Sequence, residues 1–238
     1  MAKMTLDQLV AQLQLAFGPE LVAVVLYGSA SRGEHHAERS DQNVLVVVER
    51  ITMETLAREA GVTAAWAEAG HPPPVTMTKS EWLGSADIFP IEYADVLESH
   101  RVLHGALPVS GLRVDPRDLR LQLEHEAIGK LFRLRRGILT AGSDAKKQLA
   151  LLGDSVRSFL VLFRALLRAH GDAPPKDAEG TITRAAARAG FLAAPFVKAW
   201  RHARGTEPIP AAEASAVLDA YLAGATQLAQ HIDRLGAP

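Results

Sequence analysis

The spacing of apolar residues divides the chain into a first part with mixed periodicities and a second part with helical spacing alone. In the first part, apolar runs at positions 21–27 and 44–48 have the length and branched side chains of buried strands. Helical spacing covers residues 5–17 and 52–70, and a third, short strand is expected at 75–78. Alternating helices and strands predict a sheet with helices packed on it.

Strand patterns end near residue 112. Apolar residues then recur at intervals of three and four, which is typical of packed helices. The expected helices cover residues 117–141, 144–170, 182–189, 195–203 and 211–235. The pattern therefore predicts an α/β (α+β) domain with a mixed sheet over residues 1–112, followed by an all-α helical bundle domain over residues 113–238.

The most informative local pattern joins the first two strands. Gly28 and Ser29 end the first strand, where a short helical turn would offer free backbone N–H groups to an anion. On the second strand, Asp41 and Asn43 point to one face of the sheet and Gln42 to the other, because side chains alternate along a strand. A phosphate-binding turn beside a strand that carries an acid indicates a site for a nucleotide and a metal ion.

The sequence Leu-Tyr-Gly-Ser-Ala-Ser-Arg-Gly-Glu around Gly28, with the Ser-Asp that follows, resembles the nucleotidyltransferase superfamily. That superfamily includes DNA polymerase beta, kanamycin nucleotidyltransferase and the minimal nucleotidyltransferases. Its pattern is a strand, Gly-Ser, a helical turn, and Asp-x-Asp or Asp-x-Glu on the next strand. The resemblance implies that Gly28 and Ser29 bind a nucleoside triphosphate and that Asp41 is a catalytic Mg²⁺ ligand. Arg32 is placed to reach a phosphate, although an arginine in a first helical turn is more often solvated.

Asn43 stands where the superfamily has its second acid. The resemblance implies two-metal catalysis, in which carboxylates hold Mg²⁺ ions against the triphosphate and the attacking hydroxyl. Asn43 offers a metal ion one carbonyl oxygen but no negative charge, and hard Mg²⁺ prefers charged oxygen ligands. We expect the ion that activates the acceptor to be lost, while Asp41 and the triphosphate hold the other.

The superfamily also uses a third carboxylate on a later strand, and residues 88–97 are expected to form that strand. Glu92 occupies its first acidic position and Asp95 its second. We favour Glu92 as a catalytic and metal-binding residue, because it lies between apolar neighbours, where a buried acid needs a reason. Asp95 remains the alternative. A purely structural role for Glu92, in capping a strand or pairing with an arginine, also stays open.

Composition limits the class of protein. The chain has 238 residues, of which 48% are hydrophobic and 22% charged, as in a soluble globular protein. The net charge of −1 creates no basic field, so nucleic acid is not an expected partner. No apolar stretch is long enough for a membrane span, and the amphipathic N-terminus does not have the pattern of a signal peptide, so we expect a cytoplasmic protein.

Three functions follow from these expectations. The first is a transferase that moves a nucleoside monophosphate from a nucleoside triphosphate to a hydroxyl of a small molecule or protein, with activity impaired by Asn43. The second is a relative that binds the nucleotide without turnover. The third is a protein-interaction module, such as a homodimer formed through bundle helices.

Overall fold

The computed structural model describes residues 3–31 and 42–235. Arg32 and Asp41 of the predicted site therefore lie outside the described residues. The chain divides into two compact units, residues 1–115 and residues 116–238. Within the described ranges, no helix is long and apolar enough to cross a membrane.

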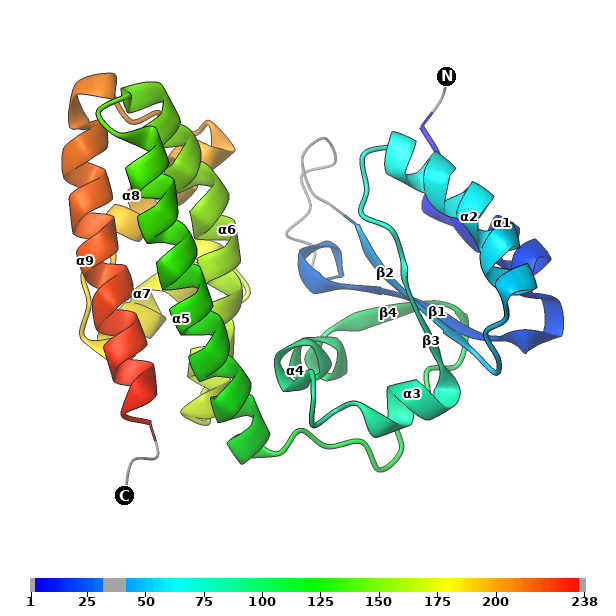
Figure 1. The fold of residues 1–238 in the computed structure, drawn as a ribbon. Helices are drawn as coiled ribbons and strands as arrows, with labels where there is room; N and C mark the ends of the chain where they lie inside the picture. Colours follow the sequence, from blue (N-terminus) through cyan, green and yellow to red (C-terminus); the bar gives the residue numbers. More distant parts are fainter. Residues whose placement is uncertain (1–2, 32–41, 236–238) are drawn as a thin grey trace. The chain divides into compact units, whose positions relative to one another are not determined.

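The first unit is built on a mixed sheet, which confirms the sheet type predicted from the sequence. Its described strands are β1 (Leu21–Tyr27), β2 (Asn43–Val48), β3 (Val75–Thr78) and β4 (His100–Gly105). They lie in the order β3-β2-β1-β4 (Figure 1). The central strand β1 is antiparallel to both β2 and β4, and β2 is parallel to β3.

Three of the four described helices of this unit begin at threonines that accept hydrogen bonds from their free N–H groups. They are α1 (Leu6–Phe17), α2 (Met53–Glu68), α3 (Lys79–Gly84) and α4 (Pro90–Glu98), and a short 3₁₀ turn, η1 (Gly18–Glu20), links α1 to β1. Thr5, Thr52 and Thr78 each cap a helix in a reciprocal capping box. Pro90 occupies the first turn of α4, where its missing N–H costs nothing.

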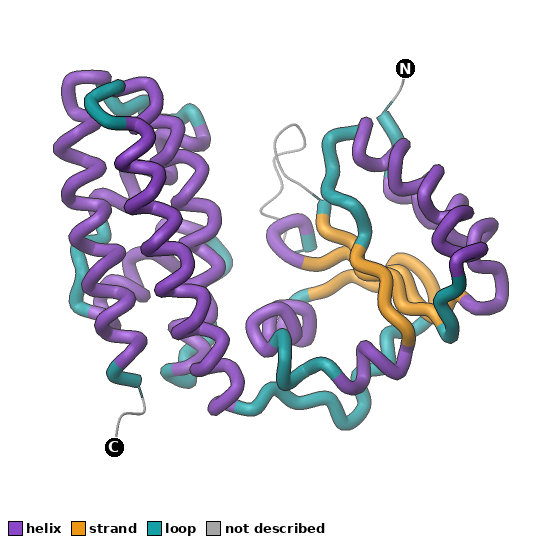
Figure 2. Tube along the Cα trace, viewed as in Figure 1, coloured by secondary structure: helices purple, strands orange, loops and turns teal. Residues whose placement is uncertain are grey.

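The two faces of the sheet carry two separate apolar clusters. Val24 and Val46 point to the face on which α1 and α2 pack, with Leu9 and Trp66 among the buried side chains. Neighbouring positions on the same strands point to the opposite face, where α3 and α4 supply Trp82, Tyr93 and Val96. The sheet thus lies between two layers of helix, as the tube in Figure 2 shows. Alternation along buried strands is the physical origin of this division.

The strand expected at residues 88–97 is wrong, because most of this segment forms α4. The apolar run Ile88-Phe-Pro-Ile91 is short enough for a strand, but Pro90 has the fixed φ of a first helical turn. Buried Tyr93 and Val96 follow at helical spacing. The next strand is β4, which begins at His100.

The described residues of the second unit form helices joined by short connections, with no strand among them. Its helices are α5 (Pro116–Ala141), α6 (Ala145–Ala169), α7 (Ala178–Ala189), α8 (Ala194–Arg204), the 3₁₀ turn η3 (Ala211–Glu213) and α9 (Ala214–Asp233). These confirm the helices predicted from the apolar spacing. The long helix α6 contacts α5, α7, α8 and α9. Its Phe159 and Phe163 are buried in an aromatic cluster with Phe196 and Tyr221.

Two histidines join the ends of α6 and α9. The Nε2 atoms of His170, which caps α6, and of His231, in the last turn of α9, are 3.0 Å apart. Burial, the charge of His170 and the charge of Arg234 together lower the pKa of His231. Two ring nitrogens at this distance share one hydrogen bond, so one ring must supply a nitrogen that carries no proton.

We expect the second unit to lose stability as the pH falls below about 6.5. A base whose pKa is lowered by folding binds fewer protons in the folded state than in the unfolded state. Its contribution to the stability of the folded state is therefore complete at high pH. That contribution is lost as the pH falls through about 6.5, where the unfolded form takes up its proton. Thermal unfolding of the second unit should occur at lower temperature at pH 5 than at pH 7.5. The variant His231→Gln should show a smaller difference. His125→Gln, at an exposed position of the same unit, should keep the full pH dependence, and equal responses of the two variants would contradict the assignment.

Candidate functional site

The turn after β1 is held in a defined geometry. β1 ends at Tyr27 and continues into the 3₁₀ turn η2 (Gly28–Ala30). Gly28 is buried and has φ +78°, a conformation that side-chain-bearing residues rarely adopt. The hydroxyl of Ser31 donates to the carbonyl oxygen of Gly28 at 2.8 Å and lies 3.0 Å from the carbonyl oxygen of Ser99. The turn is therefore fastened to the residue that precedes β4.

Asn43 lies directly against this turn. Tyr27 pairs with Asn43 on β2 and with His100 on β4, so these three residues form one row across the sheet. A Cβ atom built on Gly28 would lie 3.0 Å from Nδ2 of Asn43, which leaves little room for a side chain at position 28. The residue at the position of the superfamily's second acid is thus in contact with the Gly-Ser turn, and it brings a neutral carboxamide there.

The predicted third carboxylate lies on a helix. Asn43 shares its face of β2 with Leu45 and Val47, and α4 packs on that face. Burial raises the pKa of the Tyr27 hydroxyl, and the charges of Glu92 and Asp95 raise it further. Both α4 acids are therefore close enough to Tyr27, at the end of β1, to act on its charge.

The expectation that Glu92 is buried is wrong, because Glu92 is exposed and Asp95 is half-buried. Successive residues of a helix point about 100° apart. The apolar neighbours of Glu92 in the sequence are consequently not its neighbours in space. The structure brings both acids to the face that carries Asn43 and does not decide between them.

His71 is a residue of this region that the sequence did not single out. Its Nδ1 atom accepts a hydrogen bond from the backbone N–H of Gln42 at 3.4 Å, and its ring lies 4.2 Å from that of Trp66. An Nδ1 atom that accepts a hydrogen bond leaves the ring proton of a neutral imidazole on Nε2. His71 therefore holds the backbone at the start of β2. In the sequence, His71 follows an expected helix and precedes three prolines, and this context indicates only the end of that helix.

The described residues contribute oxygen donors of the type that Mg²⁺ binds, but not a complete metal site. Among them, no three acids or histidines are grouped so that they could hold a metal ion. The carboxamide of Asn43 and the carboxylates of Glu92 and Asp95 are hard oxygen ligands. Asp41 and Arg32 lie outside the described ranges, and so does the side chain of Ser29.

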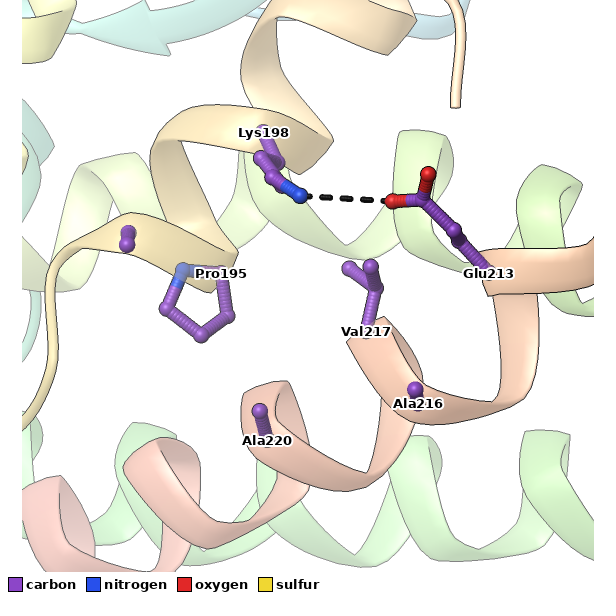
Figure 3. Close-up of a pocket in the computed structure, with 7 residues that line it drawn as sticks. Pro195, Lys198, Glu213, Ala216, Val217 and Ala220 are labelled. Atoms are coloured by element: carbon purple, nitrogen blue, oxygen red, sulfur yellow. Dashed lines mark hydrogen bonds and ion pairs between the residues drawn. The ribbon is translucent and has the colours of Figure 1, made fainter. Parts of the chain in front are cut away.

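A shallow pocket in the second unit is a separate feature. It has a volume of about 280 Å³ between α8 and α9. Its walls are alanine, proline and valine side chains, and Lys198 pairs with Glu213 across its rim at 3.3 Å (Figure 3). No residue of the predicted nucleotide site lines it, and its few polar groups already pair with each other.

The fold of this chain is similar to that of a solved adenyltransferase. A solved structure with this fold is the spectinomycin adenyltransferase AAD(9) from Enterococcus faecialis, determined with ATP and spectinomycin. The likeness covers 96% of this chain and 98% of that chain, with a TM-score of 0.62 and 11% sequence identity. The likeness is one of fold, and it agrees with the fold that the superfamily resemblance implies. The sequence matches no protein-family model and no curated protein.

Proposed function

We propose that the protein is a nucleotidyltransferase that binds a Mg²⁺–nucleoside triphosphate at the Gly28 turn. It transfers the nucleoside monophosphate to a hydroxyl of a small-molecule or protein acceptor, at a rate reduced by Asn43. The observation that carries this proposal is the contact of the Asn43 carboxamide with the Gly28 turn, on the face of the sheet covered by α4. The shared fold with an adenyltransferase solved with ATP supports it.

The proposed roles follow the order of the reaction. Gly28, Ser29 and Arg32 bind the phosphates, because backbone N–H groups and a guanidinium suit oxyanions. The acceptor oxygen attacks the α-phosphorus, the bond from that phosphorus to the bridging oxygen breaks, and pyrophosphate leaves. Glu92, or Asp95 as its alternative, takes the proton of the acceptor hydroxyl.

Mg²⁺ belongs to this proposal as part of the substrate. The ion supplies positive charge that offsets the charge of the triphosphate. Asp41 and the carboxamide oxygen of Asn43 would hold it, together with the phosphates themselves. Because position 43 is neutral, these residues suit an ion that arrives bound to the nucleotide better than an ion that stays bound without it.

Asn43 also supports a second candidate, a protein that binds the nucleotide and does not turn it over. A carboxylate at position 43 would add negative charge beside the turn, where cations gather against the triphosphate. A carboxamide adds none. Nucleotide binding needs the turn and Asp41, whereas transfer also needs activation of the acceptor, so the substitution weakens transfer more than binding.

Calorimetric titration with the Mg²⁺ complexes of ATP, GTP, CTP and UTP tests the proposal, followed by a pyrophosphate-release assay with spectinomycin as the first acceptor. We expect weak binding of at least one nucleotide that needs Mg²⁺, and slow pyrophosphate release. Binding without release selects the second candidate. If no nucleotide binds at millimolar concentration, the proposal is wrong and the protein-interaction hypothesis gains.

A further inference from the structure

One face of α5 carries a row of exposed large apolar residues, called here the α5 stripe: Leu121, Ile128, Phe132 and Leu139. Their side chains are 47%, 36%, 55% and 82% exposed. At 100° per residue, the four positions fall within an arc of about 40°. The buried residues of α5, such as Leu123 and Leu134, lie on the opposite side of the helix. The helix therefore has two apolar faces, and the helical packing of the second unit covers only one.

The spacing of the α5 stripe is the same in both directions along the helix. Its members follow one another at intervals of seven, four and seven residues, so the row is symmetric about position 130. When two copies of α5 are laid antiparallel across a two-fold axis at that level, Leu121 of one copy faces Leu139 of the other, and Ile128 faces Phe132. A surface that matches a rotated copy of itself is what a two-fold dimer requires.

The charged residues beside the stripe favour the same antiparallel alignment. Glu124 and Arg135 lie on one side of the stripe, at nearly equal distances on either side of position 130, so each Glu124 faces Arg135 of the second copy. Glu124 also pairs with Arg120 of its own helix at 3.1 Å. A parallel two-fold alignment would instead place Arg135 beside Arg136 of the second copy, and like charges repel.

The opposite side of the stripe adds no complementary charge. There, antiparallel alignment brings His125 beside Arg136 of the second copy. A neutral imidazole tolerates this contact. Charge complementarity in the antiparallel pair therefore comes from Glu124 and Arg135, once for each half of the dimer.

We propose that the α5 stripe is a homodimer interface, in which α5 of one copy packs antiparallel on α5 of a second copy about a two-fold axis at position 130. Leu121 and Leu139 are 18 positions apart on the helix, which is about 27 Å at 1.5 Å per residue. One helix pair of this length gives a small interface, so the dimer is weak and concentration-dependent. This proposal is independent of the proposed function.

Sedimentation equilibrium over about 1–300 µM protein tests the association, on a scale suited to weak dimers. We expect a reversible monomer–dimer equilibrium in the unmodified protein. Leu139→Glu should weaken it at least tenfold, because it places a charge in the apolar seam. Leu15→Glu is the matched control, since Leu15 on α1 is also 82% exposed, and it should leave the association unchanged. A monomer throughout the range, or equal effects of the two substitutions, overturns the proposal.

The chain has no cysteine, which allows the direction of pairing to be tested by cross-linking. Leu121→Cys and Leu139→Cys are prepared as two separate proteins and treated with a short bis-maleimide. In the antiparallel dimer, like positions are about 27 Å apart, so neither protein alone should cross-link. The mixture of both should cross-link readily. Cross-linking of either protein alone, or none in the mixture, overturns the antiparallel arrangement.

Discussion

Replacing Asn43 with aspartate should raise the rate of pyrophosphate release by about 10²-fold, the scale on which single charge-stabilising groups contribute to catalysis. The variant restores a carboxylate beside the Gly28 turn, on the face of the sheet covered by α4. Mg²⁺-dependent nucleotide affinity should rise as well, because a charged oxygen binds a hard cation more strongly than an amide oxygen does. Initial rates and calorimetric titrations at saturating Mg²⁺ measure both effects.

Gln42→Glu is the matched control for this prediction. It adds the same charge to the same segment, one residue earlier, where the side chain points away from the face that carries Asn43. The backbone N–H of Gln42, which donates to His71, is retained. We expect little change in rate or affinity. If both variants gain equally, the effect comes from added negative charge in general and the assignment of position 43 is wrong.

The identity of the acid on α4 can be tested in the Asn43→Asp background. Glu92→Gln should reduce the restored rate strongly and Asp95→Asn only weakly if Glu92 takes the acceptor proton. The reverse result would assign that role to Asp95.

One result would contradict the prediction for Asn43. Pyrophosphate release by the unmodified protein at an ordinary enzymatic rate of about 1–10³ s⁻¹ would show that Asn43 is an adequate ligand.

Replacing Gly105 with alanine should destabilise the first unit by about 4 kcal/mol, at the upper end of single-substitution effects. Gly105 ends β4 with φ +67°, and a Cβ atom there would lie 1.9 Å from the carbonyl oxygen of Val22. The obstacle is backbone of the central strand β1, which cannot rotate away as a side chain can. Relief of the clash requires separation of β4 from β1, with loss of the ladder between them.

Gly111→Ala separates this clash from backbone strain. Gly111 has φ +81°, but a Cβ atom there would meet nothing within 4 Å. Its substitution should cost only about 1–2 kcal/mol, the penalty of the left-handed conformation. Urea unfolding followed by tryptophan fluorescence measures both variants, since Trp66 and Trp82 are buried in the first unit. Equal losses of stability would contradict the role assigned to the close approach at Gly105.

Most of the helices, although not α4, and three of the four described strands were predictable because their patterns extend over several periods. The spacing of Leu119, Leu123 and Leu131 indicates one buried face of α5 without ambiguity. The segment from Ile88 to Leu97 is short, and its apolar start, Ile88-Phe-Pro-Ile91, fits either a strand or a buried helix. Pro90 decided between them, because a proline suits the first turn of a helix and cannot donate to a strand ladder.

The Gly28 turn could be recognised from the sequence, whereas its surroundings could not. Gly-Ser after a buried strand has a local signature, since the glycine is needed for a positive φ. The contact of Asn43 with Gly28 depends on the register of β1 and β2, and the position of Glu92 and Asp95 near Tyr27 depends on how α4 packs. The strand register and the packing of α4 arise only in the folded unit, so the spacing of residues in the sequence does not indicate them.

The hydrogen bond from Ser31 to Ser99 has a consequence for the order in which the first unit folds. The two residues are 68 positions apart in the chain. The hydrogen bond that holds the turn can therefore form only after β4 has packed on β1. Closing so long a segment costs entropy before any contact repays it. A ligand that requires the finished turn binds only the completed unit. By mass action, at a hundredfold excess over its dissociation constant it would add about 2.7 kcal/mol to the stability of that unit.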